Sequence, residues 1–282
     1  MKEILKKYYT LEIDEYREYN DGIIFMVDGV NYYFVRTTFD EDYIKMLFDL
    51  QRELASRVKL HDFVFNTEMK LLSEGCVLLK VNVLVDEIDL QDIKVFSGIV
   101  NNELLEDYVK MDTFWGNKID YLETQLSELS DNKLINNSFD YYVGISEVLL
   151  AYLKKIDFEK VNLCLTHRVF YTLSTLDYYN PLNVTFDVAL RDYASYIRIL
   201  GDQELIINLL DNYKFNKYEY NYFFVRLVFP FEYFHLVSDL LLDNKNEDKL
   251  VDLINNNLKY ENYIWYLQKL FGIYIFDWLK KE

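Results

Sequence analysis

Short runs of alternating or mainly apolar residues fill the first third of the chain. Such runs are typical of strands, and they are LEIDEY (11–16), IIFMV (23–27), VNYYFV (30–35), FVF (63–65) and CVLLKVNVLV (76–85). Asp28-Gly29 separates the second run from the third, and an Asp-Gly pair between two strands predicts a tight hairpin. Asn20-Asp21-Gly22 predicts the turn before the second run.

Helical spacing appears between the third and fourth runs and dominates from about residue 90. Residues 40–42 are all acidic, which suits the positive end of a helix. The apolar positions that follow at near-helical spacing are Ile44, Leu47, Leu54 and Val58. After Trp115, one helical face holds Ile119, Leu122, Leu126 and Leu129. Another long helix is predicted over 141–155, and Asn180-Pro181 forces a turn between the later helices.

These elements predict an α+β fold with two packed lobes. Residues 1–88 are expected to form a β-rich lobe with one helix, in the order strand, strand, strand, helix, strand, strand. Residues 89–282 are expected to form a larger helical lobe that also carries the loop-like segment around residue 167. With 282 residues, 51% of them hydrophobic, the chain can bury a large core.

The charge of the chain narrows the classes of partner. A net charge of −17 without a basic stripe disfavours binding to DNA, RNA or anionic membranes. No run of about 18 uncharged apolar residues predicts a membrane span, and the start of the chain has no apolar signal-peptide core. Cys76 and Cys164 lie in apolar runs and are expected to be buried thiols of a reducing compartment. We therefore expect a cytoplasmic protein.

Several segments, in this order and at this spacing, resemble the bacterial kinase-like group that includes aminoglycoside phosphotransferase-type enzymes, and more closely its spore-coat-associated CotS/YutH-like branch. They are LTHRV (165–169), DYYNPLNVTFD (177–187), RDYASYIR (191–198), FFVRLVFPFEYF (223–234) and FDWL (276–279). Trp115, followed by Asp120 and Glu123, resembles the start of a helix in that group. The resemblance covers most of the chain and implies a protein-kinase-like, two-lobed fold.

In such enzymes, residues of the first lobe bind ATP. The resemblance places the loop over the phosphates at 19–22, which holds a single glycine, Gly22. It places Arg36 where the third strand would carry the phosphate-binding lysine, and a guanidinium is not an equivalent point charge. Glu53 on the following helix is either the ion-pair partner of Arg36 or a solvated helix residue.

The catalytic-loop pattern departs further from active enzymes. The resemblance aligns His167, Arg168 and Val169 with a His-x-Asp sequence, so valine replaces the proton-accepting aspartate, and Ser174 replaces the metal-binding asparagine. Asp177 and Asn180 are nearby polar alternatives, of which Asp177 is the candidate substitute base, but a shift of three to eight residues along the chain changes where a side chain points.

Two aspartates after the loop have different expected roles. Asp187 fits the metal-binding aspartate, although Mg²⁺ is usually held by one or two carboxylates together with substrate phosphates. Asp192 is expected to be a buried carboxylate that binds the backbone at 167–168, with His167 packed and hydrogen-bonded. His61 and His235 have no companions at metal-ligand spacing.

Three functions remain open on these grounds. The first is a kinase-fold pseudoenzyme, a pseudokinase that binds other proteins, which the resemblance suggests are coat proteins. The second is a divergent small-molecule phosphotransferase that uses ATP and Mg²⁺ with Asp187 and Asp177. The third is a nucleotide-binding switch, which requires Arg36 and Asp187 to face one another. The degenerate loop favours the first, and the resemblance also allows a location in the spore coat.

Overall fold

The computed structural model describes the chain except residues 85–86, 101–109, 130–132, 158–160, 244–246 and 280–282, and except the side chains of 126–129, 134–135 and 242–243. The described chain forms two compact units. The first contains residues 1–101 and 164–192, and the second contains residues 102–163 and 193–282.

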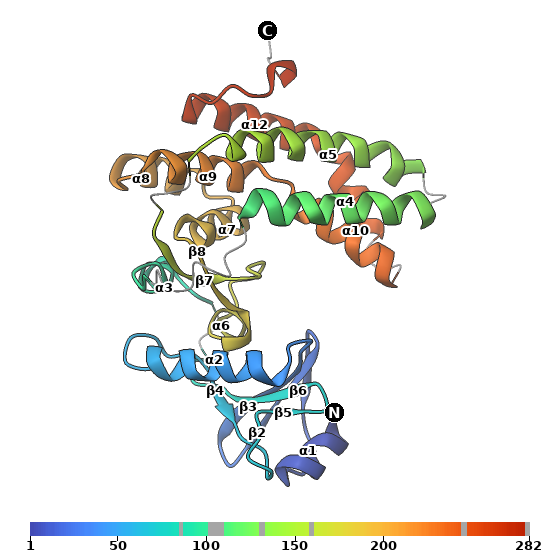
Figure 1. Ribbon diagram of the computed structural model, residues 1–282. Helices are drawn as coiled ribbons and strands as arrows, with labels where there is room; N and C mark the ends of the chain where they lie inside the picture. The colour runs from blue at the N-terminus through green and yellow to red at the C-terminus, as the bar shows by residue number, and fades with distance from the viewer. Residues whose placement is uncertain (85–86, 101–109, 130–132, 158–160, 244–246, 280–282) are drawn as a thin grey trace. The chain divides into compact units, whose positions relative to one another are not determined.

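The first unit is built on a six-stranded antiparallel sheet in the order β1-β2-β3-β6-β4, with β5 also paired to β6. The strands are β1 (Arg17–Tyr19), β2 (Gly22–Val27), β3 (Val30–Arg36), β4 (Asp62–Val64), β5 (Leu72–Ser73) and β6 (Cys76–Lys80). Val27 pairs with Val30, which confirms the predicted Asp28-Gly29 hairpin. In Figure 1 the sheet lies between α1 (Lys2–Tyr9) and α2 (Glu41–Leu54).

The prediction of a strand over 11–16 was wrong. That segment is irregular, and the unpredicted helix α1 precedes it. Leu11 and Ile13 nevertheless pack on the core cluster that joins α1 to the sheet. Alternating apolar residues can thus be buried by an irregular segment lying beside a sheet, and alternation alone does not require strand pairing.

Both faces of the sheet are buried. Phe34, Cys76 and Leu78 face α1 in one hydrophobic cluster, whereas Tyr33 and Leu79 on alternate positions are buried on the opposite face. The second helix of the unit, α2, begins at a side-chain cap in which Asp40 accepts from the Tyr43 backbone N–H at 2.8 Å. It packs against β4 through an edge-to-face contact between Phe48 and Phe63.

Residues 164–192 belong to the first unit, so the structure divides the chain differently from the expected boundary at residue 88. After residue 88, the elements of the first unit are α3 (Leu90–Ser97), β7 (Leu163–His167, of which Leu163 falls in the second unit), α6 (Thr175–Tyr178), the 3₁₀ turn η2 (Pro181–Asn183) and β8 (Val184–Val188). Backbone hydrogen bonds attach residues 164–192 to the rest of the unit: His61 N–H donates to the Tyr179 carbonyl at 2.9 Å, and Ile88 N–H donates to the Leu173 carbonyl at 2.8 Å. No local sequence pattern reveals such long-range hydrogen bonds.

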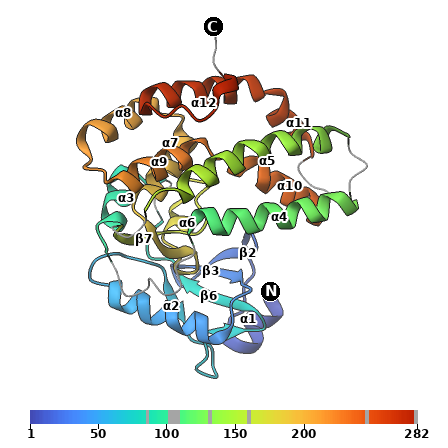
Figure 2. The same ribbon diagram turned by 45° about the horizontal axis from the view of Figure 1, so that its top comes forward.

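The second unit is helical. Its helices are α4 (Met111–Leu129), α5 (Lys133–Lys154), the main part of α7 (Leu190–Leu200), α8 (Gln203–Asn212), α9 (Lys217–Val228), α10 (Phe231–Asp243), α11 (Glu247–Asn255) and α12 (Asn257–Phe271), with the 3₁₀ turn η3 (Asp277–Leu279). Figures 1 and 2 both show α4 beside α5. Trp115 of α4 packs against Phe229, Phe231 and Phe234.

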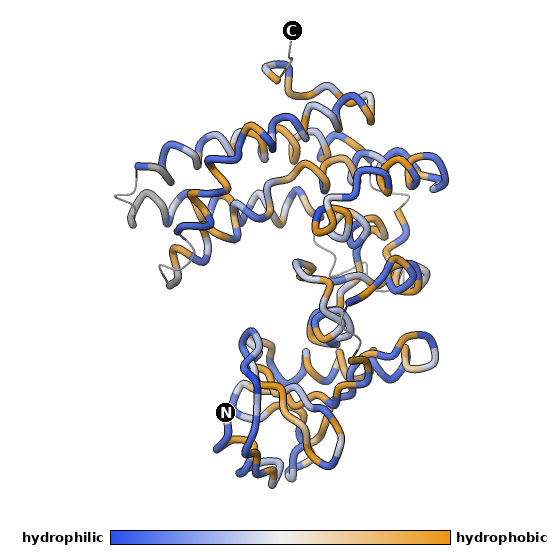
Figure 3. The backbone as a smooth tube through the Cα atoms, turned by 180° about the vertical axis from the view of Figure 1, so that it is seen from behind, coloured by the Kyte–Doolittle hydropathy of each residue, from blue (hydrophilic) through white to orange (hydrophobic). Residues whose placement is uncertain are grey.

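The hydropathy pattern of the helices agrees with their burial. Ile119 and Leu122 are buried, as their spacing predicted, while the side chains of Leu126 and Leu129 lie outside the described residues. Apolar residues recur along one side of the helices and through the strands (Figure 3). Together the sheet and the helical unit confirm the α+β class. Within the described residues, no helix is long and apolar enough to cross a membrane.

Candidate functional site

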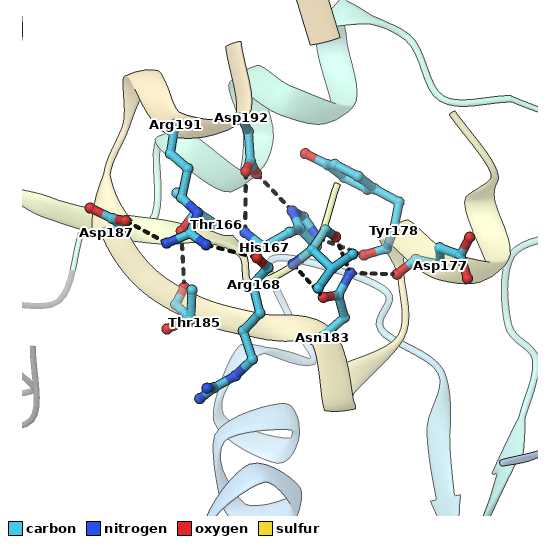
Figure 4. A network of polar contacts seen from close by, with 11 residues as sticks. Thr166, His167, Arg168, Asp177, Tyr178, Asn183, Thr185, Asp187, Arg191 and Asp192 are labelled. Carbon is cyan, nitrogen blue, oxygen red and sulfur yellow. Dashed lines mark hydrogen bonds and ion pairs between the residues drawn. The ribbon is translucent and has the colours of Figure 1, made fainter. Parts of the chain in front are cut away.

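Two paired strands position the segment that resembles a catalytic loop. Every residue of β7 is buried, and the strand ends at His167; β8 pairs with it and carries Asp187 near its end. The pairing is extended past β7 by Arg168, whose backbone N–H donates to the Asn183 carbonyl at 2.8 Å. The two paired strands thus hold both ends of the loop, which leaves β7 and returns to β8 (Figure 4).

His167 is held from three sides. Its backbone N–H donates to Oδ1 of Asp192 (3.2 Å), its Nδ1 lies 2.7 Å from Oδ2 of Asp192, and its Nε2 lies 2.6 Å from the Tyr178 carbonyl oxygen. A carbonyl oxygen only accepts, so Nε2 is the donor in its contact with Tyr178, and Nδ1 faces the Asp192 carboxyl group. Both side chains are nearly fully buried. Neither ring nitrogen is available as a base, so the imidazole fastens the loop to α7 and α6.

Val169 stands at the position of the catalytic base and is itself firmly fixed. The side-chain amide of Asn183 accepts from the Val169 backbone N–H (2.9 Å) and donates to the Val169 carbonyl (2.7 Å). The valine side chain is 48% exposed. An aliphatic group cannot take a proton from a hydroxyl, so this loop presents a rigid backbone with no base at its tip.

Asp177, the substitute base, lies under the turn between β1 and β2. Tyr19 Oη donates to Oδ2 of Asp177 at 2.6 Å, Asn20 Nδ2 donates to Oδ1 at 3.3 Å, and Thr172 Oγ1 donates to Oδ2 at 2.9 Å. Burial raises the pKa of Tyr19, and its hydrogen bond to Asp177 raises it further while Ser174 lowers it, so the phenol stays protonated and donates. The turn that would cover nucleotide phosphates is therefore tied to the loop.

The single glycine of that turn has a packing role. A Cβ built on Gly22 would lie 2.5 Å from the Phe34 carbonyl oxygen and 2.7 Å from a ring carbon of Tyr33. Tyr33 also contacts Tyr19 edge-to-face, and burial raises its pKa, with the charge of Asp177 adding to that effect. The close approach of β2 to β3 thus requires glycine at this position.

Asp187 is paired with an arginine of its own segment. Arg191 Nη1 lies 2.5 Å from Oδ2 of Asp187, and the Val188 backbone N–H donates to Oδ1 at 2.6 Å. The other end of the guanidinium donates to the Arg168 carbonyl at 2.7 Å. The side chain of Asp187 is only 6% exposed. Arg191 therefore bridges the aspartate to the loop (Figure 4), with a cation already beside it.

Arg36 and Glu53 lie elsewhere. Arg36 pairs with Cys76 across the sheet and shares the parity of Phe34, so it lies on the face covered by α1. Glu53 is exposed on α2, and no ion pair among the described residues includes either side chain.

Arg168 is held by aromatic rings of the first lobe. Its guanidinium carbon lies 5.4 Å from the ring centre of Phe39 and 5.3 Å from that of Tyr43, and it donates to the Tyr43 hydroxyl and to the Val184 carbonyl. In Figure 4 its side chain points toward α2. These contacts fix the start of α2 to the loop.

A match to a family model shows which protein family the chain belongs to. The family described as "Spore coat putative kinase YutH" matches residues 100–266, which is more than half of the chain. The chain belongs to this spore coat family. A search of curated proteins found no match.

Solved structures similar to this YutH-family chain are kinase-like. An aminoglycoside phosphotransferase from Alicyclobacillus acidocaldarius has a TM-score of 0.60 at 11% identity, with 94% of each chain covered. Choline kinase LicA from Streptococcus pneumoniae has a TM-score of 0.58 at 11% identity, covering 97% of this chain and 98% of that one. Spectinomycin phosphotransferase, solved with ADP and spectinomycin, has a TM-score of 0.53 at 13% identity, covering 94% and 92%. At such identities the similarity establishes the fold alone.

The kinase-like fold implies ATP and Mg²⁺. Whether the residues of this YutH-family chain fit a metal can be judged from the contacts of Asp187, the expected metal ligand. Mg²⁺ requires near-octahedral oxygen ligands. Here one carboxylate oxygen is bonded to the Arg191 guanidinium and the other to a backbone N–H. Within the part of the chain that the structure describes, no three or more His, Cys, Asp or Glu side chains gather as a metal site. The contacts of Asp187 do not fit a bound metal in this arrangement.

Sequence reasoning missed the residues that surround the expected ones. Arg191 lies four residues after Asp187, but Asp187 belongs to β8 and Arg191 to α7, so the i,i+4 rule for helices gave no signal for this pair. Asn183 and Tyr19 gave no signal either, because their partners lie 14 and 158 residues away along the chain.

Proposed function

We propose that this YutH-family protein is a kinase-fold pseudoenzyme that serves as an interaction protein of the spore coat. The observation that carries the proposal is the pairing of Asp187 with Arg191. Phosphoryl transfer depends on positioning and on cations that neutralise the charge on the phosphates. A metal could bind Asp187 only after a buried, charge-assisted hydrogen bond had been broken.

The loop supports the same proposal. The position of the base is occupied by Val169, whose backbone is clamped on both sides by Asn183. The alternative base, Asp177, accepts three hydrogen bonds, one of them from Tyr19 of the first turn. With these donors around it, Asp177 has few lone pairs left for a substrate hydroxyl.

A role through protein contacts rests on the family and on charge. The family description places its members in the spore coat, where function depends on association with other proteins. Nucleic acid is a poor partner for a chain of net charge −17. The kinase-like fold, without transfer chemistry, would then supply a rigid surface that includes the loop at 167–177.

Thermal denaturation with ATP, in the presence and absence of Mg²⁺, tests the proposal. Wild type, Asp187→Asn and the exposed control Asp49→Asn are compared at matched ionic strength. A ligand at about 100 times its Kd stabilises a protein by about 2.7 kcal/mol, which is several degrees in Tm for a domain of this size. We expect no Mg²⁺-dependent shift in any of the three proteins.

The divergent phosphotransferase is the result that would overturn the proposal. It requires a Mg²⁺-dependent rise in Tm in wild type and in Asp49→Asn that Asp187→Asn lacks. It also requires ATP turnover that falls in Asp177→Asn, because Asp177 is the remaining carboxylate beside the loop. A shift with ATP that needs no Mg²⁺ and is not followed by turnover would identify a nucleotide-binding switch instead.

A further inference from the structure

Helix α8 of the second unit buries little of its apolar surface. Leucine and isoleucine make up half of its 10 residues, and Ile206 is the one among them that is buried. The others are half-buried or exposed, and Ile207 is 42% exposed. The corner that leads into the helix adds Ile199 and Leu200, which are 37% and 47% exposed. Single exposed aliphatic side chains are ordinary, but several gathered in one short segment are typical of an interaction surface.

Two exposed carboxylates flank Ile207 on α8. Glu204 lies three residues before it and Asp211 four residues after it, so all three side chains share one face of the helix. Residues 199–213 hold a further acid, Asp202, and no lysine, arginine or histidine. Of the ion pairs given for the described residues, none includes these three carboxylates. The exposed face of α8 is therefore apolar at its centre and negative at both ends.

The stability of the helix does not account for Asp211. This residue lies in the last turn of α8, which has no basic residue. The aligned peptide dipoles make that end of a helix negative, so a carboxylate there is unfavourable. Asp202 at the other end is placed well, because it accepts from the Leu205 backbone N–H at 3.1 Å. A cation supplied by a partner would compensate both Asp211 and the helix end.

Charge selects the class of partner for this face. A second copy of the chain would bring like carboxylates together, and a net charge of −17 disfavours nucleic acid and anionic membranes. Lysine or arginine beside an apolar side chain would complement the face. Glu204 and Asp211 are two helical turns apart, about 10 Å along the axis. Basic residues seven positions apart on a second helix, packed along α8, match that spacing.

We propose that the exposed face of α8 around Ile207 binds a basic amphipathic helix of another protein. An apolar side chain of that helix packs on Ile207 and Leu210, and its lysine or arginine side chains pair with Glu204 and Asp211. The inference deepens the proposed role as an interaction protein and rests on it. In Figures 1 and 2, α8 lies at one end of the second unit.

A synthetic peptide is the probe: a fluorescein-labelled helix of alanine, leucine and lysine, with leucines on one face and lysines seven positions apart. Fluorescence anisotropy at low salt measures its binding to wild type, Glu204→Gln/Asp211→Asn and Ile207→Ser. The matched control, Asp42→Asn/Asp49→Asn, removes two exposed carboxylates at the same spacing on α2, where Lys45 takes the place of the isoleucine. We expect wild type and the control to bind alike, and both α8 variants to bind at least about fivefold more weakly.

Other outcomes would overturn the proposal. No binding to wild type up to about 1 mM would do so, and so would equal weakening in the α2 control, because binding would then follow net charge alone. A peptide with glutamate in place of lysine should not bind, and equal binding would remove the role of charge. Sedimentation velocity and flotation with phosphatidylcholine vesicles cover the remaining occupants. Dimerisation or vesicle binding that Ile207→Ser abolishes would assign the face to a second copy or to a membrane.

Two single variants make the result independent of the probe and of the pseudoenzyme proposal. Asp211→Asn should not lower the Tm, because it removes a negative charge from the negative end of α8. A lower Tm would mean that this carboxylate stabilises the fold, and would refute its assignment to a partner. Asp187→Asn should bind the peptide like wild type. A Mg²⁺-dependent Tm shift with ATP would refute the pseudoenzyme proposal without changing peptide binding, so the two failures are distinguishable.

Discussion

Asp192 accepts two hydrogen bonds from one residue, and both depend on its carboxylate. His167 donates to it from the backbone N–H at 3.2 Å and approaches it through ring Nδ1 at 2.7 Å, while ring Nε2 donates to the Tyr178 carbonyl at 2.6 Å. Asp192 and His167 are each 1% exposed. Alanine at position 192 would leave a buried backbone donor and a buried ring donor without acceptors, together with a small cavity.

The size of the effect follows from what each substitution leaves behind. Removing one partner of a buried, hydrogen-bonded pair leaves the other partner unpaired, and for a charged pair this typically destabilises by about 3–5 kcal/mol. Asparagine is milder, because its oxygen still accepts from the His167 backbone, and its NH₂ can donate to Nδ1 once the imidazole is neutral with Nε2 protonated. That exchange loses only the charge-assisted part of the bond, about 1–2 kcal/mol. We therefore expect Asp192→Ala to be more destabilising than Asp192→Asn by about 2 kcal/mol or more.

Hydrogen exchange of the first unit is the suitable assay. All three tryptophans, Trp115, Trp265 and Trp278, lie in the second unit, so their fluorescence does not report on β7 and β8. Peptides that cover β7 and β8 should lose protection by a hundredfold or more in Asp192→Ala, since about 1.4 kcal/mol is a factor of ten.

The exposed Asp49 on α2 supplies the matched controls, Asp49→Ala and Asp49→Asn, which should leave exchange of these peptides unchanged. The reasoning is refuted if Asp192→Ala and Asp192→Asn differ by less than about threefold in exchange, because the hydrogen bonds that asparagine keeps would then not matter.

Three further predictions concern local features. Burial lowers the pKa of His61 to about 4. Between about pH 6.5 and pH 4 the unfolded chain therefore binds a proton that the folded chain does not, so stability present above pH 6.5 is lost on acidification. In urea titrations, His61→Gln should reduce the fall in the free energy of unfolding between pH 7 and pH 5 by about 2 kcal/mol. Tyr19→Phe removes the hydroxyl donor to Asp177 and should speed amide exchange in β1 and β2 by about tenfold, with no change expected in peptides of α12. Gly22→Ala should destabilise by about 2 kcal/mol or more, because its Cβ would meet a strand carbonyl. Gly144→Ala on α5, with nothing within 4 Å of its Cβ, should instead stabilise by about 0.5–1 kcal/mol. Similar changes in Tm for the two variants would contradict this reasoning.

Local patterns were sufficient wherever one short segment decides its own conformation. The Asp28-Gly29 hairpin, the helix that begins after Asp40 and the helical second unit all follow from turn chemistry, capping and apolar spacing. These effects act over a few residues, so the sequence carries them directly. The same locality explains the error at 11–16, where alternating residues pack beside the sheet without pairing to it.

The chemistry of the loop depended on tertiary structure. The sequence predicted Asp187 as a metal ligand and Asp177 as a substitute base. In the folded chain Asp187 is paired with Arg191, and Asp177 accepts a hydrogen bond from Tyr19. With 47 acidic and 30 basic residues, composition allows many pairings and selects none. The face of β3 on which Arg36 lies was likewise decided by strand register, since a shift of one residue reverses every side chain. The sequence by itself determined most of the elements and the family-like segments. Only the fold determined which charges meet, because electrostatic and hydrogen-bond partners are selected by burial and distance.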